Sequence, residues 1–286
     1  MSGNDKFLMA GVMGWPVMHS RSPLMHNYWM KQLGVQGVYV PLEIRPEDLE
    51  AALRGLRPLR FSGCNLTIPH KLEAMKIVDE VDDVAKKIGA ISCVVVREDG
   101  SLFGTNNDWR GFLGNLRQTY PDWRADAGPV TVVGAGGGGR AVVYALLSEG
   151  AKEIRLVNRT ASKPVAIAEA FGGPIVPVPW ADRHDAIEGA AMVVNVTSQG
   201  MDGESPLDLR LDKLGADALA ADIIYTPLET PFLAAARARG NRTINGVGML
   251  IHQGPPAWKL WFGLDPVVTE EQRKLIEDSI AGKLDS

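Results

Sequence analysis

The sequence lacks the features that mark several large classes of protein. Its 30 lysines and arginines do not outnumber its 34 aspartates and glutamates, and the formal net charge is −4. It therefore has no basic excess of the kind that binds nucleic acid. Apolar runs such as 190–194 and 218–221 fall far short of the ~20 residues of a membrane-spanning helix. Residues 1–10 lack the basic and then apolar pattern of a secretory signal. We expect a cytoplasmic protein with neither nucleic acid nor a membrane as partner.

Cysteine and histidine are also scarce. The two cysteines, Cys64 and Cys93, are too few for a disulfide framework in 286 residues and are interpreted as reduced core thiols. The five histidines show no H-E-x-x-H or Cys/His spacing, so we expect no metal. His19 stands beside two serines, but the G-x-S-x-G elbow of many hydrolases is absent, and His19 is interpreted as a loop-fixing side chain.

Short β-branched runs alternate with helical stretches along the chain, which predicts α/β layers with largely parallel sheets. In the first third we expect strands at 9–14, 38–42, 61–65 and 91–96, and helices at 23–33, 47–56 and 71–88, the last with a break allowed. Glu98-Asp99-Gly100 is a turn signal that predicts a hairpin between 94–96 and 102–105.

A second unit begins near Pro129, after the polar segment 120–128. Six expected strands are what a doubly wound nucleotide-binding sheet requires. They are 130–133, 154–157, 175–178, 192–196, 219–224 and 243–244. A helix is expected at 141–148, and two more in the tail, at 249–261 and 270–280.

A glycine loop follows the first of these strands. Gly134, Ala135, Gly136, Gly137, Gly138 and Gly139 fit G-x-G-x-x-G. Between a strand and a helix, this pattern predicts a site where backbone N–H groups and the helix N-terminus bind a pyrophosphate. The alternative, a flexible glycine linker, is disfavoured by the flanking strand and helix.

The end of the next strand indicates which dinucleotide binds. An NAD site usually has a carboxylate there to accept from the ribose 2′-hydroxyl. Here the sequence has Asn158, Arg159 and Thr160, with Lys163 close behind. These cations suit a 2′-phosphate, so NADP is preferred to NAD. Alternatively, Arg159 and Lys163 form a solvated helix start.

Several short segments, in order along nearly the whole chain, resemble the motifs of the shikimate dehydrogenase family. The segments are HSRSPLMHN (19–27), NLTIPHK (65–71), GTNND (104–108), NRT (158–160), NVTS (195–198) with Gly200-Met201, DIIYTP (222–227), and GVGML (246–250) with Gln253. The resemblance implies a substrate-binding catalytic domain at 1–108 and an NADP-binding Rossmann domain at 109–245. It also implies that the C-terminal helices, 246–286, return to the substrate domain.

The resemblance assigns Lys71 and Asp108 to catalysis, beside the reacting hydroxyl, with the lysine as proton carrier. An ammonium can donate to a developing alkoxide, and the carboxylate can hold it in place. The structural alternatives are a surface lysine at a helix start and an Asp that caps a helix beginning at Trp109.

The remaining site residues also come from the resemblance. Ser20 and Ser22 are expected to bind the substrate carboxylate, although Ser22 before Pro23 is also a sound helix cap. The expected ring-hydroxyl contacts are Asn65, Thr67, Tyr225 and Gln253. Besides the glycine loop and the NRT segment, the expected cofactor contacts are Thr197, Ser198, Gly246 and Met249.

Two positions depart from the family pattern. Ser92 stands where the family has an Asn that reaches the substrate hydroxyls, and Asn107 replaces a threonine beside Asp108. Because a lost polar partner can change discrimination by orders of magnitude, the departure at Ser92 leaves the substrate open.

The main hypothesis is an NADP-dependent oxidoreductase of aromatic amino acid biosynthesis, monomeric or homodimeric. It would transfer hydride reversibly between NADP(H) and a ring hydroxyl of shikimate, the ketone being 3-dehydroshikimate. A quinate or aminoshikimate dehydrogenase, acting on another hydroxylated cyclic carboxylate, is one alternative, and a non-catalytic NADP(H)-binding sensor is another. A methylene-tetrahydrofolate dehydrogenase has a similar two-domain plan, but segments 19–23 and 65–71 fit it poorly.

Overall fold

The computed structural model describes residues 7–283, which form two compact units. The first unit runs to Asn107 and also includes Gln253–Ile276, while the second comprises Asp108–His252 and the chain from Glu277. The second unit thus continues seven residues past the expected boundary at 245. The physical reason is helix packing, because a Cβ added to Gly114 would lie 2.6 Å from the His252 ring.

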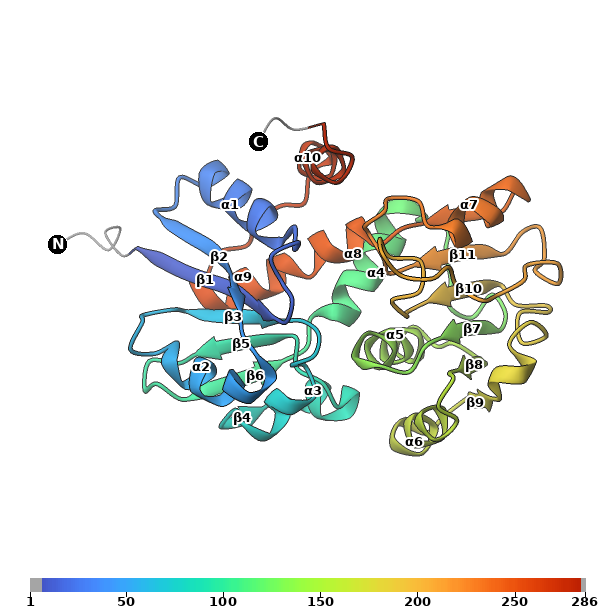
Figure 1. The fold of residues 1–286 in the computed structure, drawn as a ribbon, viewed down its shortest axis with the longest axis horizontal. Helices are drawn as coiled ribbons and strands as arrows, with labels where there is room; N and C mark the ends of the chain where they lie inside the picture. Colours follow the sequence, from blue (N-terminus) through green and yellow to red (C-terminus); the bar gives the residue numbers. More distant parts are fainter. Residues whose placement is uncertain (1–6, 284–286) are drawn as a thin grey trace. The chain divides into compact units, whose positions relative to one another are not determined.

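A six-stranded sheet forms the centre of the first unit, in the order β2-β1-β3-β5-β6-β4 (Figure 1). Its strands are β1 (Leu8–Gly14), β2 (Gly37–Glu43), β3 (Gly63–Leu66), β4 (Glu80–Val81), β5 (Cys93–Val96) and β6 (Leu102–Thr105). β1 pairs in parallel with β2 and β3, whereas β5 is antiparallel to β3 and β6. The predicted hairpin is confirmed, and the sheet is mixed.

The expected helix at 71–88 is interrupted in the structure. The helices of the first unit are α1 (Ser22–Gln32), α2 (Leu49–Gly55), α3 (Asp83–Ile88), α9 (Gly254–Phe262) and the first part of α10 (Glu270–Ile280). Segment 71–88 contains a 3₁₀ turn at Glu73–Lys76, then β4, and only then α3. Asp82 caps α3 by accepting from the Ala85 N–H at 2.6 Å, which sets the late start of that helix.

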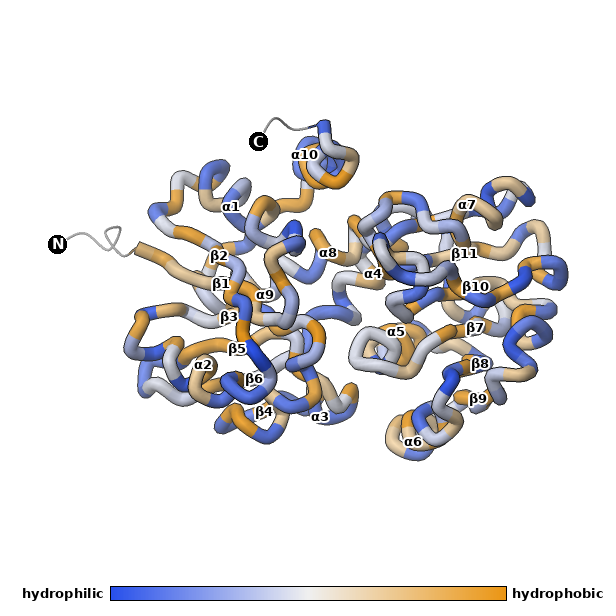
Figure 2. Tube along the Cα trace, viewed as in Figure 1, coloured by the Kyte–Doolittle hydropathy of each residue, from blue (hydrophilic) through white to orange (hydrophobic). Residues whose placement is uncertain are grey.

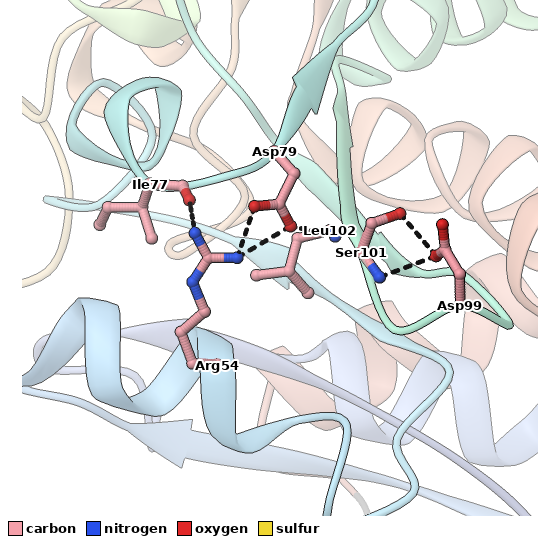
Figure 3. Close-up of polar contacts among 6 residues, drawn as sticks. All are labelled: Arg54, Ile77, Asp79, Asp99, Ser101 and Leu102. Atoms are coloured by element: carbon pink, nitrogen blue, oxygen red, sulfur yellow. Dashed lines mark hydrogen bonds and ion pairs between the residues drawn. The ribbon is translucent and has the colours of Figure 1, made fainter.

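Asp79 ties the broken segment to two other elements (Figure 3). Its carboxylate accepts from the Arg54 guanidinium of α2 at 2.8 Å and from the Leu102 N–H of β6 at 2.7 Å. Arg54 also donates to the Ile77 carbonyl at 2.7 Å. Nearby, Asp99 closes the hairpin turn by accepting from the N–H and hydroxyl of Ser101. Pairing with β6 therefore replaces helix at 79–81.

The C-terminal helix α9 packs on the first unit through two tryptophans. The Trp261 indole donates to the Val94 carbonyl at 2.9 Å, and the Trp258 indole donates to His26 Nδ1 at 2.7 Å. A Cβ at Gly63 would lie 2.1 Å from the Val94 carbonyl oxygen and 2.3 Å from the Trp261 indole nitrogen, so only glycine fits there. α9 thus belongs to the first unit, whereas α8 and the chain from Glu277 are grouped with the second.

The second unit has a wholly parallel sheet in the order β12-β11-β10-β7-β8-β9, which is the doubly wound nucleotide-binding order (Figure 1). Its strands are β7 (Val130–Val133), β8 (Ile154–Val157), β9 (Ile175–Val178), β10 (Met192–Asn195), β11 (Leu219–Asp222) and β12 (Arg242–Ile244). Its helices are α4 (Asp108–Thr119), α5 (Gly137–Ser148), α6 (Ser162–Phe171), α7 (Pro231–Ala238) and α8 (Val247–His252).

The strands β7, β10 and β11 consist mainly of hydrophobic residues and lie inside the sheet, with a neighbouring strand on each side (Figure 2). Every residue of β7, β10 and β11 is buried, as expected for parallel strands covered on both faces. The chain changes direction across the sheet between β7 and β10, which is where sheets of this type bind ligands. None of the helices within residues 7–283 is both long and apolar enough to cross a membrane.

We predict that His26 makes the first unit sensitive to acid. Burial lowers the pKa of His26 to about 3, and its Nδ1 accepts from Trp258 only when the ring is neutral. The unfolded chain therefore binds the extra proton first. The contribution of His26 to stability is complete above pH 6.5 and is lost as the pH falls toward 3, by at most about 1.4 kcal/mol per pH unit.

The test compares urea unfolding of the wild type and His26→Asn between pH 7.5 and pH 4. Asparagine offers Trp258 an oxygen acceptor that does not titrate. The free energy of unfolding should fall more steeply with acid in the wild type than in the variant. Equal slopes would show that His26 titrates alike in both states.

Candidate functional site

The glycine loop leaves backbone open at the start of α5. Gly134 has φ +121°, and a Cβ there would lie 2.8–2.9 Å from Val196 and Thr197. A Cβ on Gly139 would lie 2.6 Å from the Gly134 carbonyl oxygen. Gly136, by contrast, is exposed with nothing within 4 Å of its Cβ position, and as the N-cap of α5 it offers no capping side chain. The first N–H groups of α5 are therefore available to an anion.

The segment after β8 carries exposed positive charge. Arg159, Thr160 and Lys163 are exposed, and the Asn158 side chain donates to the Thr160 carbonyl at 3.1 Å, which fixes the turn. Val157–Thr160 contains no carboxylate. The residues present fit a dinucleotide with a 2′-phosphate, because an open helix N-terminus and exposed cations lie at the ends of adjacent strands.

Other residues expected to bind the cofactor, and Tyr225, which is expected to bind the substrate, follow the neighbouring strands of the same sheet. Thr197 is half-buried and Ser198 exposed after β10, and Tyr225 is half-buried after β11. Gly246 follows β12, where a Cβ would lie 2.0 Å from the Ile223 carbonyl oxygen. Met249, on α8, is only 8% exposed and belongs to the apolar core of the unit.

In the first unit, three expected substrate residues gather at one edge of the sheet, where β3 ends and β5 begins. The Asn65 side chain donates to the Ser92 carbonyl at 3.2 Å, and the Leu66 N–H donates to the same oxygen at 2.9 Å. Thr67 follows β3, its N–H bonded to the Met13 carbonyl. These contacts bring Asn65, Thr67 and Ser92 together.

Tyr39, which the sequence analysis did not single out, connects this edge to α1. Its hydroxyl donates to Asn65 Oδ1 at 2.7 Å and also interacts with the Ser22 side chain, a contact that acts to lower its pKa. Burial is the larger influence and raises the pKa of Tyr39 well above its usual value. The sequence signal was a tyrosine inside the strand expected at 38–42, where its hydroxyl would need a hydrogen-bond partner if the strand were covered.

Ser20 and Ser22 are arranged differently from the helix-cap alternative. The N-cap of α1 is Arg21, and no side chain caps it. Ser22 is the first helical residue, and its N–H donates to the Ser20 hydroxyl oxygen at 3.2 Å. The Ser22 side chain is therefore directed to Tyr39 rather than to the helix backbone.

Ser92 does structural work in this chain. It is 1% exposed, and its hydroxyl oxygen accepts from the Asn107 N–H at 2.8 Å. This bond fixes the backbone directly before Asp108. The Ser92 side chain, which is shorter than the asparagine of the family pattern, therefore holds the Asn107 backbone, a role that the sequence did not reveal.

The two expected catalytic residues have well-defined places in the chain. Lys71 is half-buried, and its carbonyl accepts from the Ile91 N–H at 2.8 Å, next to Ser92. Asp108 is 1% exposed and begins α4, one residue earlier than expected, so it lies in the first turn rather than before the helix. A carboxylate is favoured there by the helix dipole. Gln253 is half-buried at the start of α9. Within residues 7–283, no three His, Cys, Asp or Glu side chains are grouped to hold a metal ion.

Comparison with known proteins decides the family. A model of the shikimate dehydrogenase substrate-binding domain matches residues 12–94, and a model of shikimate/quinate 5-dehydrogenase matches residues 119–201. A curated shikimate dehydrogenase (NADP(+)) from Paramagnetospirillum magneticum is 48% identical over 96% of this chain and 99% of its own. The chain belongs to the shikimate dehydrogenase family.

Two solved structures show the breadth of this family. Shikimate 5-dehydrogenase from Thermus thermophilus, in complex with NADP(H) and shikimate, has a TM-score of 0.84 and 36% identity, covering 97% of this chain and 100% of that one. Quinate dehydrogenase from Corynebacterium glutamicum, in complex with NAD, has a TM-score of 0.86 and 33% identity, covering 94% and 98%. Both the cyclic acid and the dinucleotide therefore vary among its structural relatives.

Proposed function

We propose that the protein is an NADP-dependent shikimate dehydrogenase that transfers hydride reversibly between NADP(H) and a ring hydroxyl of shikimate, with 3-dehydroshikimate as the ketone. The observation that carries the proposal is the open N-terminus of α5 beside exposed Arg159 and Lys163, with no carboxylate at the end of β8. This chemistry suits a dinucleotide that bears a 2′-phosphate. Its relative from Paramagnetospirillum magneticum has the same activity in its name.

The bound dinucleotide supplies the nicotinamide carbon that accepts or returns the hydride, and the protein manages the proton and the orientation. We assign the proton to Lys71, which as a neutral amine accepts it from the hydroxyl during oxidation and as an ammonium returns it during reduction. We assign to Asp108 a hydrogen bond that its carboxylate accepts from the substrate. Because the structure fixes the backbone at both residues, each can be oriented before the substrate binds.

When the substrate binds, the Ser20 and Ser22 hydroxyls donate to its carboxylate and orient it, and the Ser22 hydroxyl gives up its contact with Tyr39. Asn65 has one N–H donor left after its bonds to Tyr39 and the Ser92 carbonyl, and we assign that donor to a ring hydroxyl. We assign further ring-hydroxyl contacts to Thr67, Tyr225 and Gln253.

A quinate or aminoshikimate dehydrogenase is favoured by one specific observation. The Ser92 hydroxyl oxygen accepts from the Asn107 N–H, so this position offers the substrate fewer hydrogen-bonding groups than an asparagine would.

Purified protein should be assayed with shikimate, quinate and an amino analogue, each with NADP⁺ and NAD⁺. We expect the highest kcat/KM with shikimate and NADP⁺. Absence of turnover with every cyclic acid and both dinucleotides would refute the proposed enzymatic activity. Tight dinucleotide binding without turnover would identify a non-catalytic sensor.

The compartment and assembly belong to the same proposal. In the described chain, Cys64 and Cys93 are buried and neither is in a disulfide, which suits a reducing cytoplasm. We keep a monomer or homodimer as the assembly, to be measured by sedimentation.

Replacing Lys71 should abolish most turnover without weakening dinucleotide binding. In Lys71→Met we expect kcat to fall by ~10²–10⁴, the usual contribution of a positioned acid/base. The dissociation constant for NADP⁺ should stay within about twofold, because position 71 lies outside the glycine-loop unit. Lys76→Met is the matched control, since Lys76 is exposed and paired with Glu73. Wild-type kcat in Lys71→Met would remove this lysine from the chemistry.

Replacing Arg159 should weaken NADP⁺ selectively. For Arg159→Ala we expect KM for NADP⁺ to rise about tenfold or more, through loss of a charge-assisted bond to the 2′-phosphate, with KM for NAD⁺ unchanged. Lys152→Ala removes an exposed cation at the opposite end of β8 and serves as the control. An equal effect of Arg159→Ala on both dinucleotides would contradict the assignment.

A further inference from the structure

The last residues of two adjacent strands in the second unit are polar and buried. β10 ends at Asn195 and β11 at Asp222, and the two residues are register partners. Asn195 is 0% exposed and Asp222 3% exposed. They lie at the carboxyl edge of a parallel sheet, the edge to which ligands bind. Neither residue was assigned a role by the sequence analysis.

Asp222 collects hydrogen-bond donors from three segments. Oδ1 accepts from the Ile224 N–H at 3.0 Å, and Oδ2 accepts from the Thr230 hydroxyl at 2.8 Å. Both oxygens lie 3.2 Å from the Asn195 amide nitrogen. Its hydrogen-bond partners are neutral, so its charge is balanced by dipoles rather than by a cation.

Asn195 uses every polar position of its side chain. Its amide nitrogen donates to the Gln199 carbonyl at 3.0 Å and to Asp222, while its oxygen accepts from the Thr197 N–H at 3.0 Å and the Thr197 hydroxyl at 2.7 Å. The Gln199 N–H closes the loop on the Thr197 hydroxyl at 3.1 Å. The network determines which way the amide faces.

The two loops held by these side chains carry residues assigned to ligands. The loop at 196–200 contains Thr197 and Ser198, and its position is what forces glycine at Gly134. The loop at 223–230 contains Tyr225, and its Ile224 carbonyl accepts from the Gly246 N–H at 2.8 Å. A shift of either loop would therefore reach the glycine loop and position 246.

We propose that Asp222 and Asn195 form a buried clasp that holds the loops at 196–200 and 223–230 in one fixed arrangement for dinucleotide binding. Asp222 is thus a positioning residue, which acts through Asn195, Thr197 and Ile224 without touching the cofactor. This inference rests on the proposed NADP-dependent function.

The charge of Asp222 gives the clasp a pH dependence. Burial raises the pKa of Asp222 to about 6, although its hydrogen bonds to Ile224, Thr230 and Asn195 act to lower it. The charged or titratable groups of loop 223–230 and α7 are Tyr225, half-buried, and Glu229 and Arg237, which pair with each other at 2.7 Å. As the pH falls through about 6, protonation removes an acceptor position that the donors require, and the loops loosen.

The same raised pKa separates positioning from simple stability. A carboxyl group whose pKa is raised on folding stabilises the fold below its unfolded pKa, and this contribution is lost as the pH rises through about 6. Between pH 8 and pH 5, acid should therefore raise the melting temperature of the wild type relative to that of Asp222→Asn, whose side chain does not titrate. KM for NADP⁺ is expected to rise over the same range, so a loss of global stability would not explain it.

The experiment measures the steady-state kinetics and melting of three variants. In Asp222→Ala we expect KM for NADP⁺ to rise about tenfold or more, as for loss of a hydrogen bond to a charged group. KM for shikimate should rise as well, because the loop at 223–230 carries Tyr225. In Asp222→Asn, which keeps the shape and one oxygen, we expect a smaller rise. In addition, KM for NADP⁺ should increase between pH 7.5 and 5.5 in the wild type but not in Asp222→Asn.

Thr131→Val is the matched control. The Thr131 hydroxyl is buried in β7 and donates to the Ala186 carbonyl at 2.6 Å, so its loss should lower the melting temperature without changing KM for NADP⁺. The clasp is refuted if Asp222→Ala keeps KM for NADP⁺ within twofold of the wild type, or if Thr131→Val raises it equally. Should Asp222→Ala not fold, the pH profile of Asp222→Asn decides, and a KM for NADP⁺ that rises with acid as much as in the wild type overturns the inference. Failure of the wild type to bind NADP⁺ refutes the proposed function instead.

Discussion

The close approach of the chain at Gly134 to Val196 and Thr197 is the constraint on which the dinucleotide site depends. A side chain at position 134 would collide with the loop after β10, and one at position 139 would collide with the Gly134 backbone. Because positions 134 and 139 are both glycine, α5 can begin close to the end of β7, and no side chain caps its first N–H groups. These groups and the helix dipole favour an anion without any charged side chain in the loop. The clasp of Asp222 and Asn195 holds the other side of this contact.

In the first unit, buried polar side chains connect neighbouring elements through hydrogen bonds to side chains and to the backbone. Tyr39, Asn65 and Ser92 form a chain of hydrogen bonds from α1 to the residue before Asp108. Such a network stiffens the edge that carries the assigned substrate groups, since partly satisfied polar groups would be costly there. The network also includes Ser92, whose hydroxyl oxygen accepts from the Asn107 N–H.

Much of the fold could be predicted from the sequence, because local pattern and tertiary structure agree in it. The strands of the second unit are short and mainly apolar, and those at 130–133, 154–157 and 175–178 were predicted to the residue. The helix at 71–88 was broken instead by long-range contacts of Asp79 with Arg54 and Leu102, which no local pattern reveals. Tyr39 and Asp222 were missed for the same reason, since their partners are distant in sequence or lie across strands.

A crystal structure of the full chain with NADP⁺ tests the central claim most directly. The account predicts pyrophosphate oxygens within hydrogen-bond distance of the backbone nitrogens of residues 136–139, and the 2′-phosphate beside Arg159. A dinucleotide bound with its pyrophosphate away from the start of α5 would contradict it.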